Sequence, residues 1–250
     1  MFLTSSLNSV YDSALALVYP QPCLVCRQSV ESRAYGFACR NCWTATHVFS
    51  EADAICWKCG NLSKEGTSDR SREDIRCHRC DEDTYALARA CGVYETALRV
   101  AVLSLKSQPY IPRHLADLMR QTGKLIPFDQ CTRIIPVPLH PARERARGFN
   151  QAEIIGRELS RSIRLPLDRT TLLRVVHTER HRAGMDSKAR REAVDRVFAV
   201  RHPRSVVNES VLLVDDVFTS GATASACSRS LLEAGAKEVF VFTLARANHV

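Results

Sequence analysis

Apolar stretches and amphipathic segments alternate along the second half of the chain. Residues 211–214 and 237–246 have the length and the apolar composition of buried strands. Between them, residues 224–234 carry apolar side chains at helical spacing, and Gly235 is placed to end that helix. A strand, a helix and a second strand in this order predict two neighbouring parallel strands. The pattern therefore indicates an α/β domain with a mostly parallel sheet.

The same part of the chain contains further amphipathic and strand-like segments. Helices are expected at residues 97–105, 114–120 and 152–160, and short strands at residues 93–94 and 134–139. Prolines interrupt the last of these strands, so it should end in a rigid turn outside the sheet ladder. In parallel sheets, ligands bind beyond the carboxyl ends of the strands. There we expect Asp215, Asp216 and His140 to lie together.

The first twenty residues differ from both patterns. They contain apolar residues, but they lack the basic start of a signal peptide, and Asp12 interrupts the apolar part. We expect an amphipathic helix at residues 1–20 that packs on the rest of the protein. No apolar run in the chain reaches the ~18 residues that a membrane-spanning helix needs, so no membrane span is expected.

Eight of the eleven cysteines form four Cys-x-x-Cys pairs near the start of the chain. The pairs are Cys23/Cys26, Cys39/Cys42, Cys56/Cys59 and Cys77/Cys80. Each pair offers two thiolates from one tight turn, and two pairs complete a tetrahedral zinc shell, so the four pairs provide ligands for up to two zinc ions. We predict a small, cysteine-rich double zinc ribbon at residues 21–88, followed by the α/β domain at residues 89–250.

Spacing alone leaves the pairing of these cysteines open. The simplest assignment is sequential, with the first two pairs on one ion and the last two on the other, but a cross-braced arrangement uses the same residues. Four thiolates saturate a zinc ion, so both sites are expected to be structural rather than catalytic. Few residues of the ribbon are apolar, so metal binding should supply its folding energy. Metal-bound thiolates need a reducing compartment, which indicates a cytoplasmic protein.

The net charge of +8 is unevenly distributed. Up to Ala90 the net charge is −1, and the rest of the chain carries +9. Residues 133–204 hold that whole excess, with 17 Lys and Arg against 8 Asp and Glu. Such a basic segment is typical of proteins that bind an anionic partner, either a pyrophosphate or a nucleic-acid backbone.

The segment after the strand at residues 211–214 combines two acids with a small polar loop. Asp215 and Asp216 come first, and the loop of residues 219–223 precedes the expected helix. Backbone N–H groups and the positive end of the helix dipole converge on such a loop, which suits a phosphate group. The acids suit sugar hydroxyls, or a metal ion that the substrate carries. Together they predict a sugar-phosphate site. The alternative, a buried strand before an N-capped helix, leaves the adjacent acids unexplained.

Residues 211–223 resemble, without a gap, the signature of type I phosphoribosyltransferases. These are Rossmann-like α/β proteins that bind 5-phosphoribosyl-1-pyrophosphate (PRPP). The resemblance implies that Asp215 and Asp216 act as the binding and catalytic acids at the ribose, with Mg²⁺ bridging ribose and pyrophosphate oxygens. It also implies that the 5′-phosphate is held by Thr219, Ser220, Gly221, Ala222 and Thr223.

Several segments together resemble the ComF-type competence family, which includes proteins called GntX. The matching pieces are the four cysteine pairs, Leu105-Lys106, Pro136-Val-Pro-Leu-His140, Arg147-Gly-Phe-Asn-Gln151 and residues 211–223. The resemblance covers nearly the whole chain, from Cys23 to Arg246. It implies a type I phosphoribosyltransferase domain behind a double zinc ribbon. It also implies a cytoplasmic part in natural transformation, beside recombination and helicase-type competence proteins.

Two arginines before Gly148 are candidates for binding pyrophosphate. Arg145 and Arg147 lie in an arginine-rich loop, and a guanidinium group can grip phosphate oxygens with two hydrogen bonds. Gly148 would let the backbone approach a ligand. The alternative is a solvated basic turn.

A third candidate, Arg174, begins a basic segment between these arginines and the acids. With Arg180 and Arg182, it falls where these enzymes carry the flexible loop that closes over PRPP, and such a lid would exclude water and neutralise pyrophosphate. His181 and Asp195 stand where the family usually has Gln and Asn, so the loop departs from the family's pattern at these two positions. A disordered basic connector is the alternative.

Two functions fit these observations. The first is an enzyme that transfers phosphoribose from PRPP to a nucleophile, with loss of pyrophosphate. The second is a non-catalytic competence factor that binds single-stranded DNA and keeps the PRPP pocket as a relic or a sensor. The basic segment could follow a phosphate backbone, but its only aromatics other than histidines are Phe149 and Phe198, so stacking platforms are not obvious.

Overall fold

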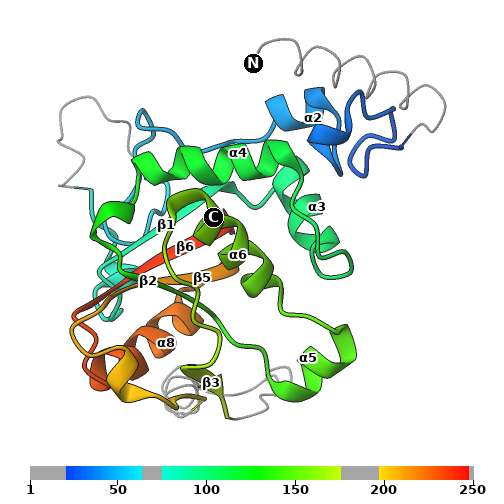
Figure 1. Cartoon of the computed structure of the whole chain (residues 1–250). Helices are drawn as coiled ribbons and strands as arrows, with labels where there is room; N and C mark the ends of the chain where they lie inside the picture. The colour runs from blue at the N-terminus through cyan, green and yellow to red at the C-terminus, as the bar shows by residue number, and fades with distance from the viewer. Residues whose placement is uncertain (1–20, 64–74, 176–196, 248–250) are drawn as a thin grey trace, which may run out of the picture.

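The computed structural model of the 250-residue chain describes residues 21–63, 75–175 and 197–247. The helix expected at residues 1–20 lies outside the described residues, as do Arg180, Arg182 and the other residues expected in the lid after position 175. In the described part, strands and helices form an α/β domain, and the cysteine-rich segment lies against it (Figure 1).

A four-stranded parallel sheet forms the centre of the domain, in the order β1-β6-β5-β2. Its strands are β1 (Leu87–Val93), β6 (Glu238–Arg246), β5 (Ser210–Phe218) and β2 (Arg133–Pro136). The two longest strands, β5 and β6, are neighbours in the middle, with Leu213 opposite Val241. The parallel pair expected from the sequence is therefore confirmed. Both strands are almost continuously buried, as expected where helices cover both faces.

Helices cover the sheet on both faces (Figure 1). One face carries α3 (Thr96–Ser104), α4 (Arg113–Gln121) and α6 (Gln151–Ile163). The other face carries α8 (Ala222–Glu233) and an antiparallel ribbon of β3 (Leu172–Arg174) and β4 (Phe198–Val200). Each face has its own apolar core, with Leu98, Ile155 and Leu212 in the first. Leu231 and Leu213 belong to the second. None of the helices in the described part has the length and hydropathy to cross a membrane.

The cysteine-rich segment and the connections add short elements. They are η1 (Arg33–Tyr35), α2 (Arg40–Thr44), η3 (His78–Cys80), η4 (Thr122–Lys124), η5 (Phe128–Gln130), α5 (Pro141–Arg147) and η6 (Pro203–Ser205). Buried side chains of the cysteine-rich segment belong to the same clusters as those of the α/β domain: Trp43 packs in the first core and Cys56 in the second. Strand β1 already begins at Leu87, so the domain boundary at residue 88 stays a prediction.

The segment expected as an arginine-rich loop is the helix α5 instead. His140, which follows the carboxyl end of β2, caps this helix because its Nδ1 accepts a hydrogen bond from the N–H of Ala142. Pro141 takes the first helical position, where its missing N–H needs no partner, and Gly148 follows the helix with a φ angle of 83°. Proline at the start and glycine after the end are helix signals, so the loop interpretation was wrong.

Three strand boundaries also differ from the expectation. Strand β1 covers Leu87–Val93, whereas a short strand was expected at residues 93–94. Strand β5 continues to Phe218, so Asp215 and Asp216 lie inside the strand and not after it. The reason is that β6 provides ladder partners as far as Arg246. Strand β2 ends earlier than expected, since Pro138 has no N–H to donate to the ladder. The acids nevertheless lie near the carboxyl end of the sheet, where ligands of parallel sheets bind.

Candidate functional site

The loop between β5 and α8 turns sharply at Gly221. Its φ angle of +84° lies in the left-handed region that favours glycine. A Cβ atom at this position would lie 2.9 Å from the ring of Phe218 and 3.2 Å from a carboxylate oxygen of Asp83. The backbone of the loop is therefore packed closely against its neighbours. The other loop residues are exposed: Thr219, Ser220, Ala222 and Thr223.

The last two residues of this exposed segment belong to the first turn of α8, because the helix starts at Ala222 and not at residue 224 as expected. The first N–H groups of a helix have no partner inside the helix, and the helix dipole places partial positive charge at this end. The N-cap residue is Gly221, which has no side chain to cap them, and Ser220 Oγ accepts only a long hydrogen bond of 3.4 Å from Ala222. Backbone donors and hydroxyl groups are thus directed to a place where an anion can bind.

Asp215 lines a small recess of about 20 Å³ between the sheet and this loop. Val137, Thr223 and Thr243 also line it. Burial and the negative charge of Asp216 raise the pKa of Asp215 to about 8, although Asp215 Oδ1 accepts a hydrogen bond of 2.8 Å from the Asp216 N–H. Such a carboxyl group can lose its proton near physiological pH when a cation approaches it.

Asp216 is buried and faces Lys106, the second residue after the end of α3. The distance between Lys106 Nζ and Asp216 Oδ2 is 3.9 Å. Within the described residues, this buried oxygen accepts no hydrogen bond. A buried acceptor without a donor is costly, so this oxygen is available to a hydrogen-bond donor on a ligand. We did not predict Lys106 as a site residue, although the motif Leu105-Lys106 contained it.

Arg174, the last residue of β3, has its guanidinium group 5.6 Å from the centre of the Phe198 ring. Burial and the positive charge of Arg143 lower the pKa of Arg174, and the negative charge of Asp215 acts in the opposite direction. Arg174 is therefore within electrostatic reach of Asp215, and Arg143 is within reach of Arg174. The sequence interpretation included Arg174 among the site residues but not Arg143.

Arg145 and Arg147 lie on α5, which stands apart from α8 (Figure 1). Arg147 donates a hydrogen bond to the side-chain oxygen of Gln151 at the start of α6, and Arg145 is exposed. In the part of the chain that the structure describes, no hydrogen bond or ion pair joins either arginine to Asp215 or Asp216. Their contact with pyrophosphate stays a prediction.

The cysteine pairs meet in two clusters, and in each cluster the four Sγ atoms lie within 4.8 Å of one another. The first cluster is Cys23, Cys26, Cys39 and Cys42, and the second cluster is Cys56, Cys59, Cys77 and Cys80. This is the sequential pairing. The Sγ atoms of Cys23 and Cys42 are 3.7 Å apart, as are those of Cys56 and Cys80, close to the edge of about 3.8 Å that follows from tetrahedral Zn–S bonds of about 2.3 Å. Four cysteine ligands fill all the positions of a tetrahedral zinc ion and leave none for water, which is typical of a structural site. The clusters are therefore compatible with two structural zinc ions.

Comparison with known proteins covers both parts of the chain. No protein-family model matches it. Competence protein F of Haemophilus influenzae is 28% identical over 232 residues, which are 90% of this chain and 90% of that protein. Competence protein ComFC of Bacillus subtilis is 25% identical over 231 residues, 82% of this chain and 89% of that protein. DNA utilization protein YhgH of Escherichia coli K12 is 27% identical over 242 residues, which cover 92% of this chain and 99% of that protein. The chain is therefore a homologue, over most of its length, of the competence proteins and of the DNA utilization protein YhgH.

The similarity of this chain to its relatives extends over the cysteine clusters as well as the parallel sheet. It therefore concerns the whole architecture and not a single shared domain. The architecture agrees with the expectation of an α/β domain preceded by a cysteine-rich segment with two potential zinc sites.

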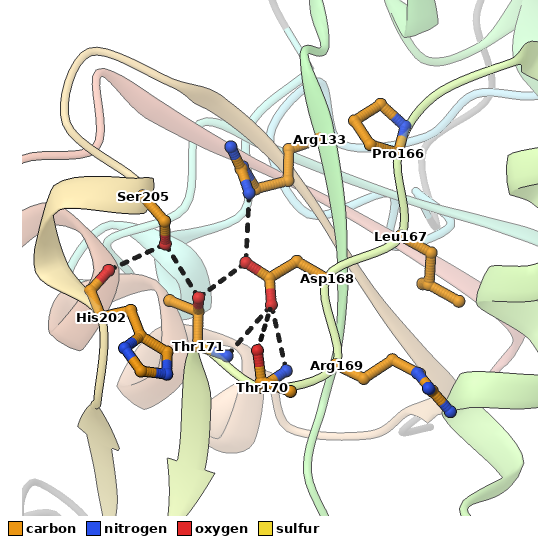
Figure 2. Close-up of a pocket in the computed structure, with 9 residues that line it drawn as sticks. All are labelled: Arg133, Pro166, Leu167, Asp168, Arg169, Thr170, Thr171, His202 and Ser205. Carbon is orange, nitrogen blue, oxygen red and sulfur yellow. Dashed lines mark hydrogen bonds and ion pairs between the residues drawn. The ribbon is translucent and has the colours of Figure 1, made fainter.

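The chain has a second polar pocket, of about 400 Å³, at the opposite end of the sheet, where Arg133 begins β2 (Figure 2). Asp168 lies at its centre, and its carboxylate accepts hydrogen bonds from the N–H and hydroxyl groups of Thr170 and Thr171. Arg133 lies 3.1 Å from the carboxylate of Asp168 and 3.6 Å from that of Glu209. The single positive charge of Arg133 offsets part of the charge of the two carboxylates, and the hydrogen bonds to Asp168 stabilise the connection between α6 and β3.

Proposed function

We propose that this homologue of competence proteins binds PRPP together with Mg²⁺ at the loop between β5 and α8. The observation that carries the proposal is the buried Oδ2 of Asp216, which accepts no hydrogen bond within the described residues and belongs to a residue three positions before the loop of residues 219–223. Ribose hydroxyls, or water molecules on a bound Mg²⁺, are suitable donors for such an oxygen. The N–H groups at the start of α8 suit the phosphate of the same molecule.

Each part of PRPP then has a partner of complementary chemistry. The 5′-phosphate binds to the backbone and hydroxyl groups of residues 219–223. Asp215 and Asp216 hold the ribose and the Mg²⁺, since carboxylate oxygens are ligands that Mg²⁺ prefers. Lys106 and Arg174 provide positive charge close to the acids, which limits the repulsion between the acids and the phosphates of the ligand.

The proposed reaction is phosphoribosyl transfer. A nucleophile forms a bond to C1 of the ribose, the bond between C1 and the pyrophosphate oxygen breaks, and pyrophosphate leaves with the electron pair. The sugar is cationic in the transition state, so positioning and charge stabilisation are sufficient, and no nucleophilic side chain is required. Arg145 and Arg147 are the proposed ligands of the leaving pyrophosphate, because guanidinium groups bind phosphate oxygens in pairs.

We further propose that the protein acts in the cytoplasm during DNA uptake. The relatives carry the names competence protein and DNA utilization protein, which supports this setting. The excess positive charge of residues 133–204 suits single-stranded DNA as a second ligand. Recombination or helicase-type competence proteins are the proposed partners. The alternative function is a non-catalytic DNA-binding factor with a relict PRPP pocket.

Calorimetric titration with PRPP in the presence of Mg²⁺ tests the main proposal. The wild-type protein should bind PRPP, and the double variant Asp215→Asn, Asp216→Asn should not. Asp117→Asn is the control, because this acid pairs with Arg120 on the surface of α4. No binding of PRPP to the wild-type protein would sink the enzyme interpretation.

Titration with a single-stranded oligonucleotide at several salt concentrations tests the second ligand. If the basic segment binds the phosphate backbone, the logarithm of the affinity should fall linearly with the logarithm of the salt concentration. DNA binding with a steep salt dependence but without PRPP binding would favour the non-catalytic alternative. Absence of DNA binding at low salt would exclude DNA as a direct ligand.

A further inference from the structure

Arg246, the last residue of β6, connects the α/β domain to the second cluster. The residue is only 6% exposed. Its guanidinium group donates a hydrogen bond to the carbonyl oxygen of Cys59 and lies 3.5 Å from the Sγ atom of the same residue. The guanidinium carbon also lies 4.5 Å from the centre of the Phe218 ring. One buried side chain thus contacts both a thiol residue of the cluster and the aromatic residue that ends β5.

Phe218 immediately precedes the loop of residues 219–223. Its ring is the neighbour that leaves no room for a side chain at Gly221, where an added Cβ would be 2.9 Å away. Tyr85 packs edge-on against the same ring, with a distance of 5.8 Å between ring centres. Arg246 and Tyr85 therefore hold the ring on which the loop is packed.

A second connection runs from the last cysteine pair to the same loop. The N–H of Asp83 donates to the carbonyl oxygen of Cys80 at 3.2 Å, and the carboxylate of Asp83, which borders the sharp turn of the loop, accepts a hydrogen bond of 2.6 Å from the Tyr85 hydroxyl. The N–H of Thr84 donates a hydrogen bond of 3.1 Å to Oγ of Ser225, and the hydroxyl of Thr84 donates one of 2.7 Å to the carbonyl oxygen of Ser225. Ser225 lies in the first turn of α8, so the cysteine-rich segment contacts both sides of the turn.

The first cluster also has four thiols, but its surroundings differ from those of the second cluster. Its buried cysteines belong to the core on the face of α3 and α4. Next to it, the ring of Trp43 lies 4.7 Å from that of His114, and the hydroxyl of Thr46 accepts a hydrogen bond of 3.1 Å from the N–H of Ala97. Among the residues that the structure describes, no hydrogen bond joins the first cluster to the loop of residues 219–223.

We propose that metal binding at the second cluster positions the anion-binding loop, and that Arg246 and Asp83 transmit this effect. The inference rests on the proposed PRPP site. It states that the structure of this site depends on the second cluster and not on the first. Short cysteine-rich segments obtain their folding energy from the metal. Without it, Cys59 and Cys80 no longer hold Arg246 and Asp83 in place, and the loop loses the surface against which it packs.

Removing one ligand from each cluster provides a matched comparison. Cys26 and Cys77 are the most accessible members of the first and the second cluster. Cys26→Ser and Cys77→Ser should each reduce the zinc content from two ions to one, measured by metal analysis of the purified protein. The affinity for PRPP should fall about tenfold in Cys77→Ser, a usual size for coupling between sites, and stay near the wild-type value in Cys26→Ser. Equal affinities in the two variants would overturn the proposal.

A pair of arginine variants makes the comparison with all cysteines in place. Arg89 also lies beside the second cluster, but its hydrogen bonds of 2.8 and 2.7 Å go to the carbonyl oxygens of Ala88 and Trp57. Arg246→Lys keeps the charge and loses the planar fork, so PRPP binding should weaken about tenfold while both zinc ions stay bound. Arg89→Lys should bind PRPP as the wild-type protein does. Unchanged PRPP affinity in Arg246→Lys contradicts the role of this residue.

Hydrogen exchange separates a failure of this inference from a failure of the proposed function. The amides of residues 219–226 report on the loop whether or not PRPP is its ligand. Their exchange should be faster in Cys77→Ser than in the wild-type protein and unchanged in Cys26→Ser. Unchanged exchange in Cys77→Ser overturns the coupling. Faster exchange in a protein that does not bind PRPP supports the coupling and overturns only the assignment of the ligand.

Discussion

Lys106 and Asp216 face each other near the carboxyl end of the sheet, with 3.9 Å between Nζ and Oδ2. The lysine follows α3 on one face of the sheet, and the acid belongs to the central strand β5. The distance allows electrostatic attraction but no hydrogen bond, and Oδ2 accepts none from the described residues. Both groups can therefore turn toward a ligand without breaking a hydrogen bond to each other.

Replacement of this lysine should weaken ligand binding. We expect Lys106→Met to lower the affinity for PRPP about tenfold or more, because hydrogen bonds to charged groups contribute roughly 1.5–3 kcal/mol. The charge of Lys106 also lowers the pKa of Asp215, so that pKa should rise further in the variant. Calorimetry measures the affinity, and Lys124→Met, an exposed lysine on η4, is the control. Wild-type affinity in Lys106→Met contradicts a role in binding.

The raised pKa of Asp215 should make stability depend on pH. The carboxyl group titrates at about 8 in the folded protein and at about 3.9 in an unfolded chain. Between these values the folded state keeps a proton that the unfolded state has lost, so the free energy of unfolding decreases as the pH rises from about 4 to about 8. Asp215→Asn should reduce this decrease, measured by urea unfolding across the same range. The same pH slope in both proteins would show that the carboxyl group is ionised throughout.

The affinity for PRPP should increase with pH over the range in which the free energy of unfolding decreases. A cation at the site favours the ionised form of Asp215, so binding of PRPP with Mg²⁺ releases a proton when the pH is below about 8. Calorimetry in buffers of different ionisation enthalpy measures that proton. We expect the affinity to increase as the pH rises toward 8, and proton release to be absent in Asp215→Asn. Proton release of the same size in that variant would assign it to another group.

Two glycines with nearly the same backbone conformation test the packing of the loop. The φ angle is +84° at Gly221 and +83° at Gly148, so alanine should cost roughly 1–2 kcal/mol of backbone energy at either position. A Cβ at Gly148 meets nothing within 4 Å, whereas at Gly221 it meets Phe218 and Asp83. Gly221→Ala should therefore lower the free energy of unfolding more than Gly148→Ala does, measured with urea, and should also weaken PRPP binding. Equal losses of stability would show that the loop has room to relax.

The two tryptophans should report on the two metal sites separately. Trp43 follows Cys42 of the first cluster, and Trp57 follows Cys56 of the second. The first cluster contains the exposed Cys26, while no cysteine of the second is exposed, so a chelator should remove metal from the first cluster sooner. The fluorescence of Trp57→Phe, which retains Trp43, should then change before that of Trp43→Phe. Simultaneous changes would show that the clusters lose their metal together.

Local signals in the sequence predicted most elements near the site. The apolar run before Asp215 and the aromatic run that ends at Arg246 are neighbouring parallel strands, as expected. The length of β5 was underestimated, because the polar character of Asp215 and Asp216 hides a strand that continues beside β6. The sequence also contained the signal for helix α5, because Pro141 occupies a position that is typical of a helix start. The arginines that follow it were interpreted as a loop instead.

The sequence by itself determined the chemistry of the protein: eight thiols in four pairs for metal, two adjacent acids, and a glycine-containing loop before a helix. These features depend on residues that are neighbours in the chain. Only the tertiary structure decided that the cysteines pair sequentially, that Lys106 faces Asp216, and that Arg246 reaches Cys59, 187 positions earlier. Such contacts follow from the order of the strands and from the face on which each segment packs, and a local pattern of residues does not encode either.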